Sequence, residues 1–169
     1  MRILILTWRD LRHPQAGGAE LYTEQVAKRW VERGHEITLF AAAVEGIPAV
    51  EKVDGYTVVR AGSRYTVYRK ARSWWQHVGQ YQNFDLVIDM INTVAFEAHT
   101  WITDVPIVGF IHQTCEEIWA HNAPWPASLL GRHVLEPKWL RSYRGRHVLA
   151  VSQSTKDSIA RFGVTDVTV

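Results

Sequence analysis

The chain has 169 residues, which is enough for one domain with a sizeable hydrophobic core. Hydrophobic residues make up 47% and charged residues 21%, a composition typical of globular proteins that excludes a disordered or fibrous chain. The net charge of +2 and the lack of any RNA- or DNA-binding motif argue against a nucleic-acid partner, and no apolar run approaches the roughly 18 residues that a membrane-spanning helix needs.

Cysteine content and the first residues bear on the cellular location. Cys115 is the single cysteine, so no internal disulfide forms, which fits a reducing compartment. Residues 1–8 are apolar but lead straight into a glycine-containing loop and lack the small-residue cleavage site of a signal peptide. We therefore expect a cytoplasmic protein.

Strand patterns and helix patterns alternate along the chain. Short, continuous apolar runs predict buried strands at 2–7, 36–44, 56–62, 85–89, 107–111, 147–152 and from 164 onward. Amphipathic spacing predicts helices from the glycines to Gly34, over 68–82, from Thr93 to about Trp101, and from Ser154 to Gly163. Thr93 and Ser154 are the expected caps of the last two helices, and Asp157 completes a capping box with Ser154. Prolines break residues 113–145 into short helices and loops.

This alternation predicts an α/β fold, a Rossmann-like, doubly wound and mostly parallel sheet with helices on both faces. No internal repeat or linker divides the sequence, so we expect one domain over residues 1–169. The sequence stops where a strand–helix unit has closed and another strand has begun. We therefore expect a fragment cut near a domain boundary.

Two adjacent glycines, Gly17 and Gly18, follow the first predicted strand and open the first helix. Ligands of doubly wound sheets bind at this loop, where glycines expose backbone amides and the helix N-terminus adds a partial positive charge. An anion site is one interpretation, and a tight turn is the other. The sequence GGAE lacks the third glycine of a dinucleotide fingerprint, and no P-loop is present, so redox and NTPase functions are disfavoured.

Three stretches resemble the N-terminal half of the family 4 glycosyltransferases, retaining enzymes of the GT-B fold. They are PQAGGAELYTEQVAKRWVERGHEITLF (14–40), IVGFIHQT (107–114) and HVLAVSQSTKDSIARFGV (147–164), in matching order and spacing. The resemblance implies sugar transfer from a nucleotide sugar, such as a UDP- or GDP-sugar, to a hydroxyl of a glycan, a lipid-linked or a small-molecule acceptor, without a metal or other cofactor. It also implies a separate C-terminal nucleotide-sugar domain with an E-x7-E motif, which this sequence lacks, so residues 1–169 are the expected acceptor-binding domain, inactive alone.

The resemblance also assigns roles to individual residues. His112 directly follows the stretch IVGFI and matches a histidine that positions the transferred sugar, so it is the predicted catalytic residue. Gly17 and Gly18 match the loop whose amides face the donor phosphates. Ser152 either contacts a phosphate or only caps a helix, and Glu20 is either functional or an acid favoured by the helix dipole.

Polar residues at the ends of other predicted strands are expected to contact the acceptor. These candidates are Arg9, Asp10, Asp89 and Asn92, and each is also a plausible loop residue. No general base is evident, and retaining transferases of this fold are thought to pass the acceptor proton to the leaving phosphate on the same face.

A metal site is the less favoured interpretation of the residues around His112. Cys115 and His121 lie near it with two glutamates between them, Glu116 and Glu117, but the spacing matches no zinc motif. We predict metal independence.

Residues 55–84 hold five basic side chains, contain no acid, and include aromatic residues such as Tyr65 and Trp75. The basic residues are Arg60, Arg64, Arg69, Lys70 and Arg72. The simpler interpretation is a solvated helix face, and the alternative is a contact with an anionic membrane surface, to which each cation contributes about 1 kcal/mol. On that alternative the protein is peripheral at the inner face of the membrane.

Two other functions compete with the transferase. One is a noncatalytic Rossmann-like module that binds a carbohydrate, lipid or protein partner. The other is a nucleotide-dependent epimerase or dehydrogenase, which the missing glycine fingerprint disfavours.

Overall fold

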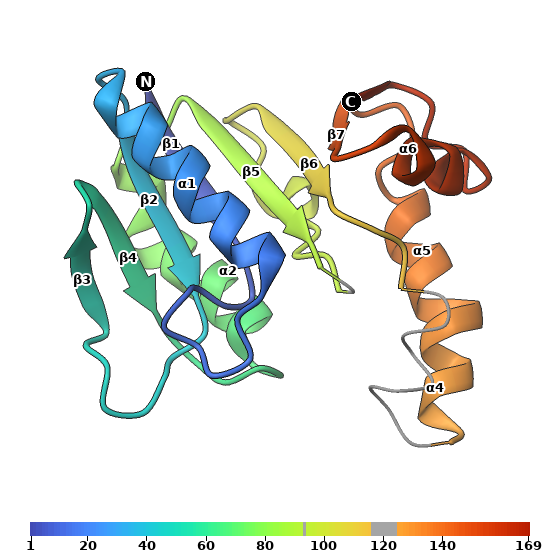
Figure 1. The fold of residues 1–169 in the computed structure, drawn as a ribbon, viewed down its shortest axis with the longest axis horizontal. Coiled ribbons are helices and arrows are strands. Elements are labelled where there is room, and N and C mark those ends of the chain that lie inside the picture. The colour runs from blue at the N-terminus through green and yellow to red at the C-terminus, as the bar shows by residue number, and fades with distance from the viewer. Residues whose placement is uncertain (93, 116–124) are drawn as a thin grey trace. The chain divides into compact units, whose positions relative to one another are not determined.

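The structure is a computed structural model that describes residues 1–92, 94–115 and 125–169. Its strands form an 8-stranded, mostly parallel sheet in the order β3-β4-β2-β1-β5-β6-β7-β8 (Figure 1). The strands are β1 Arg2–Leu6, β2 Glu36–Ala41, β3 Val50–Val53, β4 Tyr56–Arg60, β5 Leu86–Ile91, β6 Ile107–Ile111, β7 Val148–Ala150 and β8 Val167–Thr168. The helices are α1 Gly18–Glu32, α2 Val67–His77, η1 Gly79–Tyr81, η2 Ala98–Thr100, α4 Ala127–Leu130, η3 Gly131–Leu135, α5 Glu136–Arg141 and α6 Gln153–Ala160. The predicted α/β, Rossmann-like fold is confirmed.

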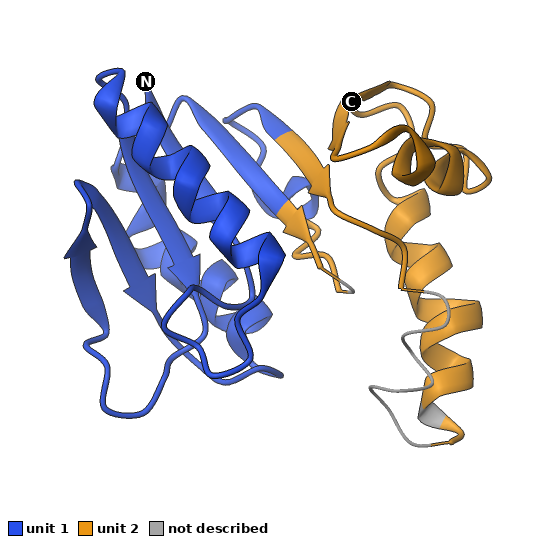
Figure 2. Ribbon diagram, in the orientation of Figure 1, with its two compact units in different colours: residues 1–89, 98–107 blue, residues 90–97, 108–169 orange. Residues whose placement is uncertain are grey.

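Contacts within the chain divide it into two compact units (Figure 2). Unit 1 comprises residues 1–89 and 98–107, and unit 2 comprises residues 90–97 and 108–169. In unit 1, β1 pairs in parallel with β2 and β5, β2 pairs in parallel with β4, and β3 pairs antiparallel with β4. In unit 2, β7 pairs in parallel with β6 and with β8.

The core of unit 1 is a sheet with a helix on each face (Figure 1). The β1 side chains from Ile3 to Leu6 are all buried, because a central parallel strand is covered on both faces. Burying one such leucine or isoleucine stabilises the fold by about 1.5–3 kcal/mol. On α2, Ala71 and Trp75 are buried while the basic side chains of that helix are exposed, as the sequence predicts.

The core of unit 2 surrounds Tyr143, which is almost completely buried. Gly109 on β6 lies directly against the Tyr143 ring, since a Cβ at position 109 would be 3.0 Å from that ring. A glycine inside a strand commonly marks such a close approach. The glycine in IVGFI therefore serves packing in unit 2.

The helix predicted from Thr93 to Trp101 is wrong. Thr93 lies outside the described residues, residues 95–97 are not helical, and only the single turn η2 forms. The buried Asp89 carboxylate accepts the Ala98 N–H at 2.9 Å, and Glu97 adopts a φ of 51° that no helix contains. These two local features override the helical periodicity.

Strand β3 was not predicted, because its sequence VEKV is polar and half exposed at the edge of the sheet. Its pairing with β4 turns at Asp54 and Gly55, whose φ angles are 45° and 89°. An Asp-Gly pair with two positive φ angles is typical of a tight hairpin turn. This dipeptide was the available sequence signal for the hairpin.

The predicted cap of the last helix is also corrected. Helix α6 begins at Gln153, and its N-cap is Ser152, whose Oγ accepts the Thr155 N–H at 3.2 Å. Ser154 is the second residue of the helix, so it does not form a capping box with Asp157. The extended backbone of Ser152, with φ −157° and ψ 161°, is the conformation that a cap requires.

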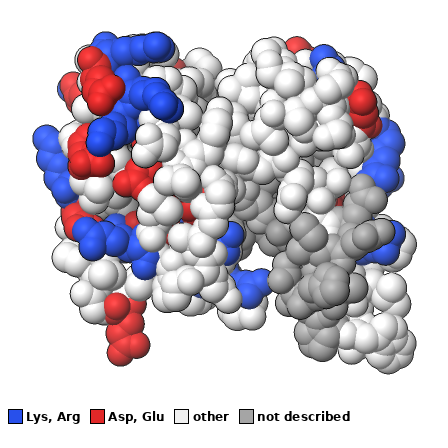
Figure 3. Space-filling model, viewed as in Figure 1, with Lys and Arg blue, Asp and Glu red and all other residues white. Residues whose placement is uncertain are grey.

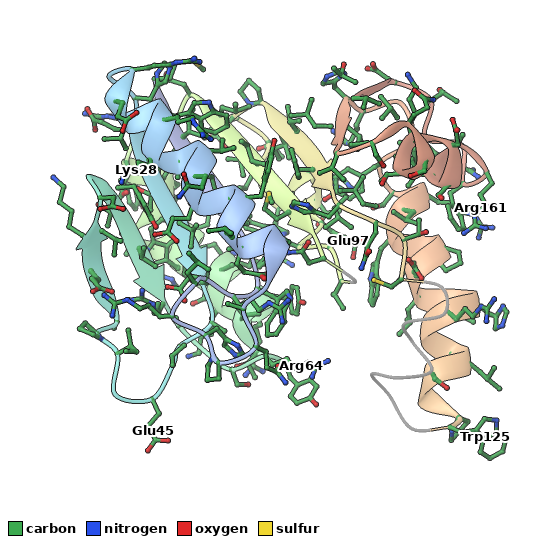
Figure 4. The ribbon with its side chains drawn as sticks, in the orientation of Figure 1. Lys28, Glu45, Arg64, Glu97, Trp125 and Arg161 are labelled. Atoms are coloured by element: carbon green, nitrogen blue, oxygen red, sulfur yellow. The ribbon has the colours of Figure 1, made fainter. Side chains whose placement is uncertain are left out.

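Surface charges of both signs are interspersed on the visible face of unit 1 (Figure 3). Lys28 on α1 (Figure 4) pairs with Asp54 at 3.5 Å, but each side chain is almost half exposed to solvent. Exposed pairs of this kind contribute between 0 and about 1 kcal/mol.

A buried ion network built on Arg60 differs from these surface pairs. The Arg60 Nε donates to Asp10 at 2.7 Å, its Nη1 donates to the Pro48 carbonyl at 3.0 Å, and its Nη2 lies 3.0 Å from Glu51. Arg12 pairs with the second oxygen of Glu51 at 2.9 Å. Only 3% of Arg60 is exposed, so its predicted place in a basic surface is wrong. Arg60 instead ties β4 to β3 and to the loop after β1.

Replacing Arg60 with methionine leaves Asp10 buried without its cation, so we expect a loss of about 3–5 kcal/mol in the free energy of unfolding. Urea denaturation measures this loss. The control is Arg69→Met on the exposed face of α2, which we expect to change stability by less than about 0.5 kcal/mol. Equal losses in the two variants would contradict the buried network.

Candidate functional site

The carboxyl ends of β1, β2 and β4 form one edge of unit 1, and the loops that follow them are joined by backbone hydrogen bonds. The Ala42 N–H donates to the Trp8 carbonyl at 3.1 Å, and the Ala43 N–H donates to the Gly62 carbonyl at 2.8 Å. The segment after β2 therefore holds the other two loops in place. Ligands of open parallel sheets bind at this edge.

Three nitrogen-bearing side chains gather around the buried indole of Trp8 in this frame. The Arg9 guanidinium lies 4.4 Å from the Trp8 ring centroid and that of Arg64 lies 5.7 Å from it. The His13 ring meets the indole edge-on with its centroid at 5.1 Å. We call these residues the Trp8 cluster, and Arg64 extends from the lower end of unit 1 in Figure 4.

The carboxylate of Glu20 connects the Trp8 cluster to the start of α1. One oxygen accepts the Gly17 N–H at 2.7 Å, and the other lies 2.8 Å from the Arg9 Nε. Glu20 is 3% exposed, so this contact is made out of water. The acid predicted in the first helical turn therefore caps the helix and fixes an arginine at the same time.

Gly17 and Gly18 are both exposed at the N-terminus of α1. A Cβ at Gly18 would meet nothing within 4 Å, and one at Gly17 would make only an ordinary contact of 3.7 Å with Glu20. Gly17 has a φ of −145°, which other residues also adopt. Serine is moreover a better helix N-cap than glycine. The fold therefore does not require glycine at either position, and the tight-turn interpretation loses its basis.

His13 is held as a neutral ring by its surroundings. Its Nδ1 accepts the Gln15 N–H at 3.1 Å, so the proton of the neutral ring lies on Nε2. Burial lowers the pKa of His13 below its ordinary value of 6.5, and the nearby Arg9 and Arg64 lower it further, while Asp10 and Glu20 act in the opposite direction. Near neutral pH the ring is a hydrogen-bond donor without a charge.

In unit 2, the structure brings His112 and Ser152 together through Thr155. The Thr155 hydroxyl donates to the His112 carbonyl at 2.9 Å and lies 3.0 Å from the Ser152 Oγ. The His112 ring packs against Phe110 with centroids 5.0 Å apart. The end of β6 and the N-terminus of α6 are thus fixed to each other, with the predicted catalytic histidine between them.

The predicted acceptor contacts have structural partners. Asp10 is buried against Arg60, Arg9 pairs with Glu20, and the Asp89 carboxylate, which is 0% exposed, holds the Ala98 amide. Asn92 is half-buried and forms an isolated bridge with Val94. Their contact with an acceptor stays a prediction.

Three of the residues considered for a metal site, Glu116, Glu117 and His121, lie outside the described residues. Within the described ranges, no group of three His, Cys, Asp or Glu side chains is placed to hold a metal ion. Cys115 is buried, and its N–H donates to the Glu136 carboxylate at 2.5 Å. Metal independence stays a prediction.

Comparison with known proteins decides the family. Residues 16–169 match the family described as Glycosyltransferase Family 4. The chain belongs to this family. No curated protein matches it.

Among solved structures, this family 4 chain is similar to a sucrose-phosphate synthase from Thermosynechococcus elongatus, with a TM-score of 0.68 and 14% sequence identity. The match covers 95% of this chain and 44% of the synthase chain. At this identity the likeness shows the fold alone. It agrees with the Rossmann-like half of a GT-B fold that the sequence motifs predict.

Among the residues that the structure describes, no helix combines the length and the apolar character needed to cross a bilayer.

Sequence reasoning missed the Trp8 cluster of this family 4 domain. The sequence analysis gives Trp8 and His13 no role, and it places Arg64 in the basic segment of residues 55–84, either on a solvated helix face or at a membrane surface. The cluster joins residues more than fifty positions apart, so no spacing within one segment reveals it. The available signal was weaker: Trp8, Arg9 and His13 follow a predicted buried strand, where ligand-binding residues are common.

Proposed function

We propose that this chain is the N-terminal, acceptor-side half of a retaining glycosyltransferase. The full enzyme would transfer a sugar from a UDP- or GDP-sugar to a hydroxyl of a glycan, a lipid-linked or a small-molecule acceptor. Membership of family 4 supports the transferase class. A match that spans 44% of the synthase chain supports a further nucleotide-sugar domain in the full-length protein, without which this half is inactive.

The observation that supports the proposal most directly is the pair of exposed glycines at the start of α1. Since the fold tolerates a side chain at both positions, their lack of one is best explained by close approach of a ligand. Gly18 is the first residue of α1, and amides at this position have no carbonyl partner within the helix. This amide and the positive end of α1 would stabilise charge on the leaving nucleotide diphosphate.

His112 and Ser152 have the remaining proposed roles of this chain in sugar transfer. His112 would hydrogen-bond the transferred sugar and hold it in the reactive orientation. Thr155 supports this role because it anchors the His112 backbone at 2.9 Å. Ser152 already caps α6, and we propose a donor phosphate contact for it only as an addition to that cap. No metal or side-chain base enters the proposed reaction, in which the acceptor proton passes directly to the leaving phosphate.

A cytoplasmic enzyme that is peripheral at an anionic membrane is part of the proposal. Arg64, Arg69, Lys70 and Arg72 are exposed, and Tyr65 beside them is 82% exposed. Among the described residues none of these four cations forms an ion pair. Such unpaired cations with exposed aromatic side chains suit a surface of anionic lipid.

Replacing Gly18 with alanine separates ligand binding from folding. We expect the free energy of unfolding to stay equal or to rise by up to about 1 kcal/mol, because alanine restricts the unfolded chain. Sugar transfer by the full-length protein should fall at least about tenfold, since the methyl group blocks the approach to the amide. The control is Gly55→Ala, whose φ of 89° and clash at 2.6 Å with Val31 should destabilise the fold. Unchanged transfer by Gly18→Ala would remove the proposed phosphate contact.

Replacing His112 with alanine in the full-length protein should lower kcat/KM for transfer by about 100-fold, because the sugar loses its positioning hydrogen bond. A screen of UDP- and GDP-sugars identifies the donor for this assay, and circular dichroism checks the fold. The matched control is His147→Ala at an exposed pair with Asp166, which should leave transfer unchanged. Near-normal transfer by His112→Ala would overturn the role of His112.

The membrane contact is tested by cosedimentation with phosphatidylglycerol vesicles. We expect binding at low salt that is lost at high salt, because screening removes attraction between exposed charges. Combined replacement of Arg69, Lys70 and Arg72 by glutamine should abolish this binding. Binding of equal strength to neutral phosphatidylcholine vesicles would contradict an electrostatic contact.

A further inference from the structure

We propose that the Trp8 cluster is a phosphate subsite in which Arg9, His13 and Arg64 bind a phosphate group carried by the acceptor. This inference rests on the proposed function and narrows the acceptor to a phosphorylated molecule. It arises from side chains that the transfer step described above leaves unused.

Arg9 is arranged in advance to bind an oxyanion. Its Nε is engaged by Glu20 at 2.8 Å, and its guanidinium stacks 4.4 Å from the Trp8 ring centroid. Within the described part of unit 1, its two Nη groups make no hydrogen bond, and these groups carry the fork of donors that matches phosphate. Binding therefore costs little additional side-chain entropy at Arg9.

Arg64 supplies charge from a second loop. Its guanidinium lies 5.7 Å from the Trp8 ring centroid and 5.8 Å from that of Tyr65, and the side chain is exposed. It forms no ion pair with the acids that the structure describes. Two arginines from different loops on one indole provide donors from different directions, as a tetrahedral phosphate requires.

His13 adds a donor without adding charge. Its Nδ1 is occupied by the Gln15 N–H, so its Nε2–H is the group that can donate to an anion. The charges around it are those of Arg9, Arg64, Asp10 and Glu20. Asp10 is balanced by Arg60 and Glu20 by Arg9, which leaves Arg64 as the excess positive charge. The cluster therefore complements an anion.

Glu20 shows why this anion differs from the donor diphosphate. Its carboxylate lies between the backbone amides at the start of α1 and the Trp8 cluster, with one oxygen on the Gly17 amide and the other on Arg9. A single phosphate that contacted both the α1 amides and the Trp8 cluster would lie against the negative charge of Glu20, which is unfavourable. The amides at the start of α1 and the Trp8 cluster therefore serve two separate phosphates, and the acceptor is the remaining substrate to carry the second.

The experiment is isothermal titration calorimetry of the full-length protein with inorganic phosphate, glucose 6-phosphate, farnesyl phosphate and UDP. We expect Arg64→Gln to weaken the binding of inorganic phosphate about tenfold, which is the usual effect of one lost charge-assisted hydrogen bond. The same variant should change the affinity for UDP by less than about twofold. The matched control Arg69→Gln should leave both affinities unchanged. Preference for glucose 6-phosphate or for farnesyl phosphate identifies a soluble or a lipid-linked acceptor.

The proposal is overturned if the wild-type protein does not bind inorganic phosphate, or if Arg69→Gln weakens phosphate binding as much as Arg64→Gln does. It is also overturned if Arg64→Gln weakens the binding of UDP as much as the binding of phosphate. Since Arg64 is an exposed loop residue, its glutamine variant should fold normally, and circular dichroism checks this. Failure of sugar transfer in the donor screen would overturn the proposed function while leaving Arg64-dependent phosphate binding in place. The two failures are therefore distinguishable.

Discussion

The buried carboxylate of Glu20 is the interaction on which the first loop of this domain depends. It completes the N-terminus of α1 by accepting the Gly17 amide, and it holds Arg9 against Trp8. Because Gly17 has no side chain, the helix cap is supplied from within the helix instead of from the cap residue. This arrangement leaves the surface above the glycines open while still ending the loop in a defined geometry. The Glu20 side chain thus stabilises the loop before α1 and leaves its glycines accessible to a ligand.

The rest of unit 1 keeps this loop in place. The segment after β2 forms hydrogen bonds with the loops after β1 and β4, and Arg60 joins β4 to Asp10 in the first loop. A buried arginine with two carboxylates is costly to desolvate, and a core of the same volume built from apolar side chains would often be as stable. The network is better explained by the position that it gives to residues 9–12 than by a gain in stability. Through these contacts, the Arg60 network holds the edge hairpin β3–β4 against the loop of the candidate site.

The sequence predicted those features of the fold that depend on one segment at a time. The buried strand β1, the end of α1 just before Gly34 and the outward-facing cations of α2 follow from local sequence patterns. The errors lie where a side chain of one segment contacts another segment: Asp89 on β5 captures the Ala98 amide and prevents a helix, and Asp10 and Glu51 draw Arg60 into the interior. The same limit applies to the site. His112 and the glycines were found from a motif, whereas the Trp8 cluster exists only because two strands end at the same edge.

The acids of this domain bear on the chemistry of the proposed sugar transfer. The buried carboxylates in the described part of the chain are Asp10, Glu20, Asp89 and Glu136, and each accepts a guanidinium or a backbone N–H. Each of these carboxylates fixes a loop or a helix start through that contact, so the proposed reaction assigns none of them the role of a base. Groups that can donate a hydrogen bond to an anion, by contrast, are abundant. They are the first amides of α1, the two arginines at Trp8 and the neutral His13. On the proposed function, a domain with such bound acids and available hydrogen-bond donors suits a reaction in which the leaving phosphate itself accepts the proton, and in which the protein binds phosphate and orients the sugar.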